Sequence, residues 1–135
     1  MKRIILFAIT LFLLAACSAS PKVDLGGEWK LISYGDKTNP TPALPGVDTT
    51  ITFENGRIGG NVGCNMFGGE YQIKGDKISF EPIMSTEMYC ETTWAQEQGV
   101  LGMLTSNGAV TVQLAGDTLT ITSADGSSAL ILMRK

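Results

Sequence analysis

The chain has 135 residues, with 10 basic and 13 acidic side chains and no histidine. This length fits one small domain. The acidic balance excludes the electrostatic footprint that nucleic-acid binding requires, and the missing histidine removes the usual base of a catalytic thiol and a common metal ligand.

The N-terminus has the pattern of a bacterial lipoprotein signal peptide. Lys2 and Arg3 precede an apolar run over residues 4–14, which is too short for a comfortable permanent membrane span. The run ends in Leu-Ala-Ala-Cys17, which resembles the lipobox, where the cysteine thiol is diacylated and becomes the new N-terminus. We therefore predict a signal peptide over residues 1–16 and lipidation of Cys17. The alternative is an ordinary signal peptide with an incidental cysteine.

Cleavage and acylation also predict where the mature chain lies. Without its signal the chain keeps 8 basic and 13 acidic residues, a net charge of −5, so the acyl chains must hold it to the membrane. Each buried methylene contributes about 0.8 kcal/mol, which makes such an anchor effectively permanent. Ser18, in place of aspartate, favours the outer membrane in a Gram-negative source. We expect residues 17–24 to be a polar tether and the protein to face the periplasm.

Residues 25–135 are predicted to form one mainly β domain. Short stretches that alternate apolar and polar side chains are typical of half-buried strands, and Gly-containing pairs between them mark hairpin turns. Three prolines within residues 34–46 predict an extended surface loop. The result is a compact, antiparallel, barrel-like sheet. The apolar strand positions are Trp29, Leu31, Ile51, Phe53, Ile58, Val62, Tyr71, Ile73, Ile78, Phe80, Val110, Val112, Leu114, Leu119, Ile121 and residues 129–133, and the turns are Asn55-Gly56, Gly75-Asp76, Gly116-Asp117 and Asp125-Gly126.

One segment, residues 91–104, favours a helix. Trp94, Leu101 and Leu104 recur near the helical spacing, and Thr93 with Gln96 matches a capping box. We expect the apolar stripe of this helix to cover an open end of the sheet. The fold class is therefore α+β, mainly β with one helix.

The remaining two cysteines, Cys64 and Cys90, form an even pair in a chain predicted to be exported. A disulfide is the simplest expectation for such a pair. In the chain-entropy model, closing a loop of this length stabilises the fold by about 3.5 kcal/mol.

The glycine-rich stretch around Cys64, GNVGCNMFGGEY, could in principle serve as a phosphate loop, a metal site, a nucleophile loop or a structural turn. It lies between predicted strands and lacks the lysine of a phosphate loop. Two thiols are too few for structural zinc. Thiolate and thioether ligands suit Cu(I), and Met66, Met84 and Met88 are near in sequence, although methionines more often fill cores. Glu70, Glu81 and Glu87 could meet in space, but their spacing does not favour catalysis. We predict no catalytic, cofactor or metal site.

A structural role for the stretch explains more of its residues. Gly63, like Gly59 and Gly60, suits a sharp bend or a close backbone approach. We expect Asn65 to shape a turn, since it tolerates left-handed dihedrals and its side chain can bond neighbouring backbone groups. We expect Phe67 to plug the core and Gly68-Gly69 to let the chain reverse. A Cys64–Cys90 disulfide would then join the helix to the sheet.

Four segments in this order resemble the META domain, or HslJ-like, family of small bacterial envelope proteins. They are GGEWKL at 26–31, VGCNMFGGEY at 62–71, ISF at 78–80 and STEMYC at 85–90, where Thr86 begins a Thr-x-Met-x-Cys pattern. The resemblance implies a compact β-barrel-like fold with one helix in a lipid-anchored or secreted protein. It also implies a loose link to heat shock and envelope stress, including novobiocin resistance, and it supplies no catalytic residues.

These observations favour a non-enzymatic envelope lipoprotein, accessory or stress-linked, that acts through contacts with a partner protein. One alternative is a binder of a small apolar ligand or peptide in a cavity of the barrel. Another is an inhibitor or chaperone that uses the proline-rich loop at residues 38–45 as its reactive surface.

Overall fold

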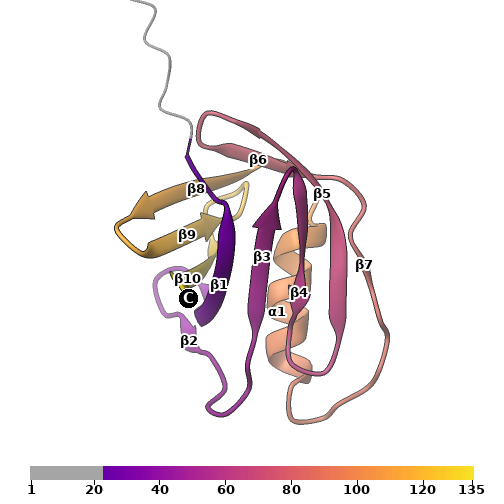
Figure 1. The fold of residues 1–135 in the computed structure, drawn as a ribbon. Helices are drawn as coiled ribbons and strands as arrows, with labels where there is room; N and C mark the ends of the chain where they lie inside the picture. The colour runs from indigo at the N-terminus through magenta and orange to yellow at the C-terminus, as the bar shows by residue number, and fades with distance from the viewer. Residues whose placement is uncertain (1–22) are drawn as a thin grey trace, which may run out of the picture.

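A computed structural model describes residues 23–135, and the predicted signal peptide, Cys17 and most of the tether lie outside them. The described chain is mainly antiparallel β-structure with a single helix, which confirms the predicted fold class (Figure 1). The elements are β1 Gly27–Asp36, β2 Thr41–Pro42, β3 Thr50–Glu54, β4 Arg57–Asn61, β5 Met66–Lys74, β6 Lys77–Phe80, β7 Met84–Ser85, α1 Trp94–Thr105, β8 Val110–Ala115, β9 Thr118–Thr122 and β10 Ser128–Arg134.

Eight strands close into a barrel. They are hydrogen-bonded in the order β10-β9-β8-β6-β5-β4-β3-β1, and β1 pairs with β10 to complete the circle. The two short strands lie off this circle, β2 beside β1 and β7 beside β5. Every strand pair is antiparallel. The predicted turns Asn55-Gly56, Gly75-Asp76 and Gly116-Asp117 join β3 to β4, β5 to β6 and β8 to β9.

The alternation in the strands places one row of side chains inside the barrel. In β3 the pattern is Thr-Ile-Thr-Phe-Glu, and only Ile51 and Phe53 are fully buried. Because successive side chains of a strand point to opposite faces, this row packs against equivalent rows from the other strands. The core contains Trp29, Leu31, Ile51, Phe53, Ile58, Val62, Phe67, Ile78, Val110, Val112, Leu119, Ile121, Leu130 and Leu132.

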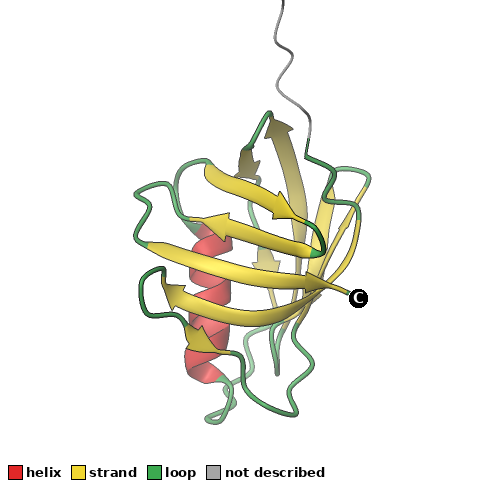
Figure 2. Ribbon diagram, turned by 90° about the vertical axis from the view of Figure 1, so that its left-hand side faces the viewer, coloured by secondary structure: helices red, strands yellow, loops and turns green. Residues whose placement is uncertain are grey.

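Helix α1 fills one end of the barrel, as expected. Figure 1 shows it behind β3, β4 and β5, and Figure 2, turned by 90°, shows it behind the strands of the opposite wall. Among the strands, the helix lies nearest to β1 and β10. Val100, Met103 and Leu104 are its buried apolar side chains and join the barrel core.

The predicted start of the proline-rich loop at residue 34 is wrong. Strand β1 continues to Asp36, and Tyr34 belongs to the core, where it packs against α1 at Gly99. Residues 36–42 are exposed, as predicted for a surface loop, and within them Thr41–Pro42 forms β2 and pairs with β1. Proline can occupy this strand since β2 is an edge strand that need not donate on its outer side.

Candidate functional site

The glycine–cysteine stretch leads from β4 into β5 at the helix end of the barrel. Asn65 precedes β5 and is buried, with an exposed fraction of 4%. Its side-chain oxygen accepts hydrogen bonds from the Met88 amide and the Thr86 hydroxyl, both at 2.8 Å. Its side-chain nitrogen donates to the Met88 carbonyl at 2.8 Å and to the Glu97 carboxylate at 2.5 Å. The Asn65 amide therefore holds the segment before the disulfide, residues 86–88, against the start of β5.

This geometry corrects the role expected for Asn65. Within residues 23–135 the only non-glycine residue with a positive φ is Asn55, so Asn65 does not shape its turn through left-handed dihedrals. It acts through its side chain, which links the start of β5 to residues 86–88 and to Glu97, which lie between 21 and 32 positions later in the sequence.

Glu97 accepts the other hydrogen bonds of this site. Its carboxylate projects from the first turn of α1 and is 1% exposed. Besides the Asn65 amide, it accepts from the Cys64 backbone N–H at 2.6 Å and from the Thr93 hydroxyl at 2.7 Å. We call Asn65, Thr86, Thr93 and Glu97 the Asn65 cluster. No buried side-chain polar atom of the described chain lacks a hydrogen-bond partner, so the cluster is complete without a ligand.

The Asn65 cluster keeps a buried carboxylate ionised. Burial raises the pKa of Glu97, but the hydrogen bonds from the side chains of Asn65 and Thr93 and from the backbone of Cys64 and Asn65 outweigh it, and the net pKa lies below the ordinary 4.5. The position of Glu97 in the first helical turn also favours the charged form, because backbone N–H groups there carry partial positive charge. Glu97 forms no salt bridge within residues 23–135.

The predicted disulfide is present between Cys64 and Cys90, whose Cα atoms are 6.2 Å apart. Cys64 is next to Asn65, and Cys90 is three residues before the helix N-cap at Thr93. The covalent link and the Asn65 cluster therefore fix the same junction of helix and sheet.

Neighbouring glycines leave the space that this junction needs. A Cβ on Gly63, which has a φ of 135°, would lie 3.0 Å from the side chain of Thr93. A Cβ on Gly69 would lie 2.6 Å from the side chain of Ile83. The expected chain reversal at Gly68-Gly69 is wrong, since both residues lie inside β5. Phe67 is 6% exposed and fills the core.

The start of the helix also differs from expectation. The helix begins at Trp94 rather than residue 91, and Thr93 makes no side-chain capping bond to the helix backbone. Gln96 takes no part in a capping box. It lies fully buried, accepts a hydrogen bond from the Leu44 amide and donates to the Thr49 hydroxyl, both at 2.7 Å. Gln96 thus ties the proline-rich region to the helix.

Beside the junction lies an exposed apolar patch. It consists of Met66, Met84, Met88, Tyr89 and Trp94, whose exposed fractions run from 46% for Trp94 to 78% for Met84. The interpretation of the three methionines as core filler is therefore wrong. Trp94 also departs from the expected core-facing stripe and instead packs against Tyr89, with ring centroids 5.4 Å apart. We call these five residues the apolar patch.

A groove of about 420 Å³ separates the chain from Ser85 to Tyr89 from helix α1, and Met88, Tyr89 and Trp94 of the patch line it. One wall is the chain from Ser85 to Tyr89. The other is formed by Trp94, Gln98 and Leu101, which lie on one face of α1. The buried carboxylate of Glu97 and the side chain of Asn65 lie at its base. The groove thus combines exposed apolar side chains with a rigid polar floor.

Comparisons with known proteins identify the family. The profile of the META domain matches residues 22–135. The chain belongs to the META domain family.

Three solved structures share the fold of this META domain. A protein from Burkholderia xenovorans, solved by NMR, is 26% identical with a TM-score of 0.64, and the match covers 81% of each chain. A second NMR structure is 20% identical with a TM-score of 0.60 and covers 79% of this chain and 88% of the other. A DUF4847 protein from Bacteroides vulgatus is 15% identical with a TM-score of 0.58, covering 82% and 93%. No curated protein matches the chain.

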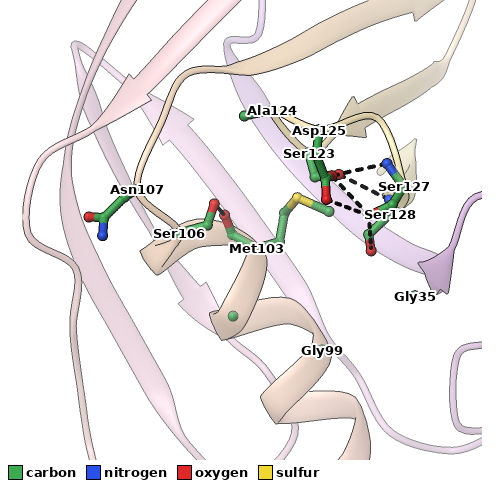
Figure 3. A pocket seen from close by; sticks show the side chains of 11 residues that line it. Gly35, Gly99, Met103, Ser106, Asn107, Ser123, Ala124, Asp125, Ser127 and Ser128 are labelled. Atoms are coloured by element: carbon green, nitrogen blue, oxygen red, sulfur yellow. Dashed lines mark hydrogen bonds between the residues drawn. The ribbon is translucent and has the colours of Figure 1, made fainter.

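The META domain has a second pocket, of about 430 Å³, between the end of α1 and the turn before β10 (Figure 3). Asp125 lies in this turn and accepts hydrogen bonds from the Ser123 hydroxyl and from the amide and hydroxyl of Ser127. These hydrogen bonds lower the pKa of Asp125 to about 2, and the bond from the Ser123 side chain has the largest effect. Within residues 23–135 the Asp125 carboxylate thus bonds only to residues of its own turn, and these hydrogen bonds stabilise the β9–β10 hairpin.

Of the three glutamates Glu70, Glu81 and Glu87, the first two lie next to each other in the fold. Glu81 accepts a hydrogen bond from Gln72, and its amide donates to the Glu70 carbonyl. No group of three or more Cys, Asp or Glu residues within residues 23–135 could hold a metal ion. In the same range no helix is long and apolar enough to cross a bilayer.

Proposed function

We propose that this META domain protein is a lipid-anchored, non-enzymatic protein of the cell envelope that acts by binding another protein. The apolar patch carries this proposal. Five large apolar side chains are exposed on β5, β7 and the chain from Met88 to Trp94, and two of them, Tyr89 and Trp94, pack against each other. Exposed apolar patches mark interaction sites in soluble domains. Methionine and aromatic side chains are also enriched at protein interfaces.

The Asn65 cluster supports this role by making the patch rigid. The Asn65 amide holds both the N–H and the C=O of Met88, and the disulfide holds Cys90 two residues later. A surface that is fixed before binding loses less conformational entropy when it binds. The buried polar groups therefore serve to present the patch, which fits a binding protein better than an enzyme.

The sequence supports the location. The lipobox-like segment ending at Cys17 and the serine that follows it favour an anchor in the outer membrane with the domain in the periplasm. In this setting the protein is an accessory or stress-linked component of the envelope. Mass spectrometry of the mature N-terminus tests the anchor: a Cys17→Ala variant should lose both the acyl mass and its membrane fractionation. An unmodified Cys17 in the native protein would refute it.

Protein binding is tested by site-specific photo-cross-linking in living cells. A photoreactive amino acid replaces Tyr89 in the patch or, as the control, Met133, which is 48% exposed on β10. We expect a discrete cross-linked partner from position 89 and not from position 133. Equal cross-linking from both positions, or none from position 89, would contradict the proposal.

The two alternative functions gain no specific support from the fold. The barrel interior is filled by side chains such as Trp29, Phe53 and Leu130, each with an exposed fraction of 0%. The proline-rich region is tied to the barrel through hydrogen bonds from the amides of Ala43 and Leu44. A free reactive loop would lack such bonds.

A further inference from the structure

The outer edge of β7 is unpaired. The Thr86 amide donates to the Met66 carbonyl, and both backbone groups of Met88 bond Asn65, so the even-numbered residues of this extended stretch face the barrel. Backbone groups alternate in direction along a strand, so those of Ser85 and Glu87 face away from β5. Within the described chain β7 pairs only with β5. The edge from Ser85 to Tyr89 is thus open to a further strand.

The groove lies along this open edge. On its far side, Trp94, Gln98 and Leu101 follow each other at intervals of four and three residues and form a stripe on α1. A strand between an open sheet edge and a helix gains backbone hydrogen bonds on one side and side-chain pockets on the other. The groove volume of about 420 Å³ accommodates a few side chains of such a strand.

The segment that contains both walls of the groove is acidic. From Ile78 to Met133 the chain contains six acidic residues and no lysine or arginine. Two of the acids, Glu87 and Glu91, are exposed on the loop that carries the patch. An acidic rim favours a cationic occupant and disfavours anionic lipid.

We propose that an extended segment of a partner protein, with apolar side chains flanked by lysine or arginine, binds in the groove by adding a strand to the edge of β7. The segment bonds the backbone of Ser85 and Glu87. Its apolar side chains pack on Met88, Trp94 and Leu101, and its cationic flanks face the acidic rim. This inference rests on the proposed function and names the chemistry of the partner.

A random 12-residue peptide library displayed on phage, selected against the full chain in mild detergent, tests the proposal. We expect the enriched peptides to alternate apolar residues and to carry lysine or arginine. The strongest peptide is then synthesised and its affinity measured against variants. Ser85→Pro removes the outward N–H and should weaken binding about tenfold, whereas the matched Ser85→Ala variant keeps the N–H and should bind like wild type.

Two further pairs of variants separate the other contacts. Trp94→Ala should also weaken binding about tenfold, and Met133→Ala, at a similarly exposed position on β10, should not. Glu87→Lys should weaken binding up to about fivefold at low salt and less at high salt, and Asp117→Lys on the β8–β9 turn should have no effect. Because Ser85→Pro could disturb folding, a peptide N-methylated at alternate residues tests the same backbone bonds on the wild-type protein and should bind at least tenfold more weakly.

The proposal fails if no peptides are enriched, if the enriched peptides are acidic, or if N-methylation leaves affinity unchanged. If the protein dimerises and Ser85→Pro abolishes the dimer, the edge binds a second copy of this chain. If the protein binds phosphatidylethanolamine–phosphatidylglycerol vesicles and Trp94→Ala abolishes that binding, the site binds a membrane. Either result overturns the proposal. If position 89 cross-links to a partner in cells but the library yields no enriched peptides, the proposed function stands and only the inference about strand addition is refuted.

Discussion

Replacing Glu97 with glutamine tests whether the buried carboxylate holds the helix to the sheet. Glutamine keeps one oxygen that can accept from the Cys64 amide and the Thr93 hydroxyl. Its new NH₂ group must then face the NH₂ group of Asn65, which cannot rotate away because Met88 holds both ends of that amide. The variant therefore loses one hydrogen bond and places two donors against each other.

The size of the effect follows from these contacts. A hydrogen bond to a charged group contributes about 1.5–3 kcal/mol, and a buried donor left without a partner costs about 1–3 kcal/mol. Since the two contributions overlap, we expect Glu97→Gln to lower the free energy of unfolding by about 2–4 kcal/mol at pH 7. This is a large share of the roughly 5–15 kcal/mol that holds a typical domain together.

The same residue predicts a pH dependence. The pKa of Glu97 in the folded protein lies below the ordinary 4.5, so the unfolded chain binds a proton first on acidification. The stabilisation is fully present above pH 4.5 and is lost as the pH falls through the folded-state pKa. The exposed carboxylates of Asp36 and Asp125 also have lowered pKa values. Both residues are present in the wild type and in Glu97→Gln, so their contribution cancels when the two are compared.

Urea unfolding at pH 7 and at pH 3, followed by circular dichroism, measures both effects. We expect the difference in unfolding free energy between wild type and Glu97→Gln to shrink on acidification. Glu54→Gln, at an exposed position at the end of β3, serves as the matched control and should follow wild type at both pH values. A Glu97→Gln variant with wild-type stability at pH 7 would refute the assignment of Glu97.

Three further changes test other parts of the junction and barrel. Replacing both Cys64 and Cys90 with serine should lower the free energy of unfolding, measured in urea, by about 3.5 kcal/mol. Two free thiols in a titration of the native protein would contradict the disulfide. Gly60→Ala places a Cβ 1.9 Å from a backbone oxygen of β3 and should prevent folding. Gly126→Ala has open space but a φ of 77°, so it should cost only about 1–2 kcal/mol, and equal melting temperatures for the two variants would refute the close approach at Gly60. Asn65→Asp sets a second carboxylate against that of Glu97 and should lower the free energy of unfolding. Urea unfolding at several pH values should show that the loss relative to wild type shrinks as the pH falls, and a loss that stays constant would count against the cluster.

The strands and their turns could be predicted from sequence because each is a local pattern. Ile51 and Phe53 alternate with threonines, and Asn55-Gly56 lies where a two-residue turn must form. The closure of the barrel could not be predicted in this way. It depends on pairing such as Trp29 with Arg134, which joins residues more than 100 positions apart and leaves no periodic signal in the chain.

Asn65 and Thr86 were predicted as structural residues, but their partner Glu97 was missed, for a different reason. A glutamate in a short helix normally faces water, so Glu97 carried no local sign of burial. The signal lay in its register: Glu97 is three residues before Val100 and seven before Leu104, both of which face the core. A charged residue on the buried stripe of a helix needs partners, and the only polar stretch held nearby by the disulfide contains Asn65.

The first strand completes the barrel only by joining the last one. Seven register pairs connect β1 with β10, and the nearest of them, Asp36 with Ser128, are 92 positions apart. At a synthesis rate of about 5–20 residues per second, β1 waits for roughly 5–20 s with one edge unpaired. The barrel therefore cannot close on a chain that is still being synthesised, because its first strand has no partner for that edge until β10 has been made.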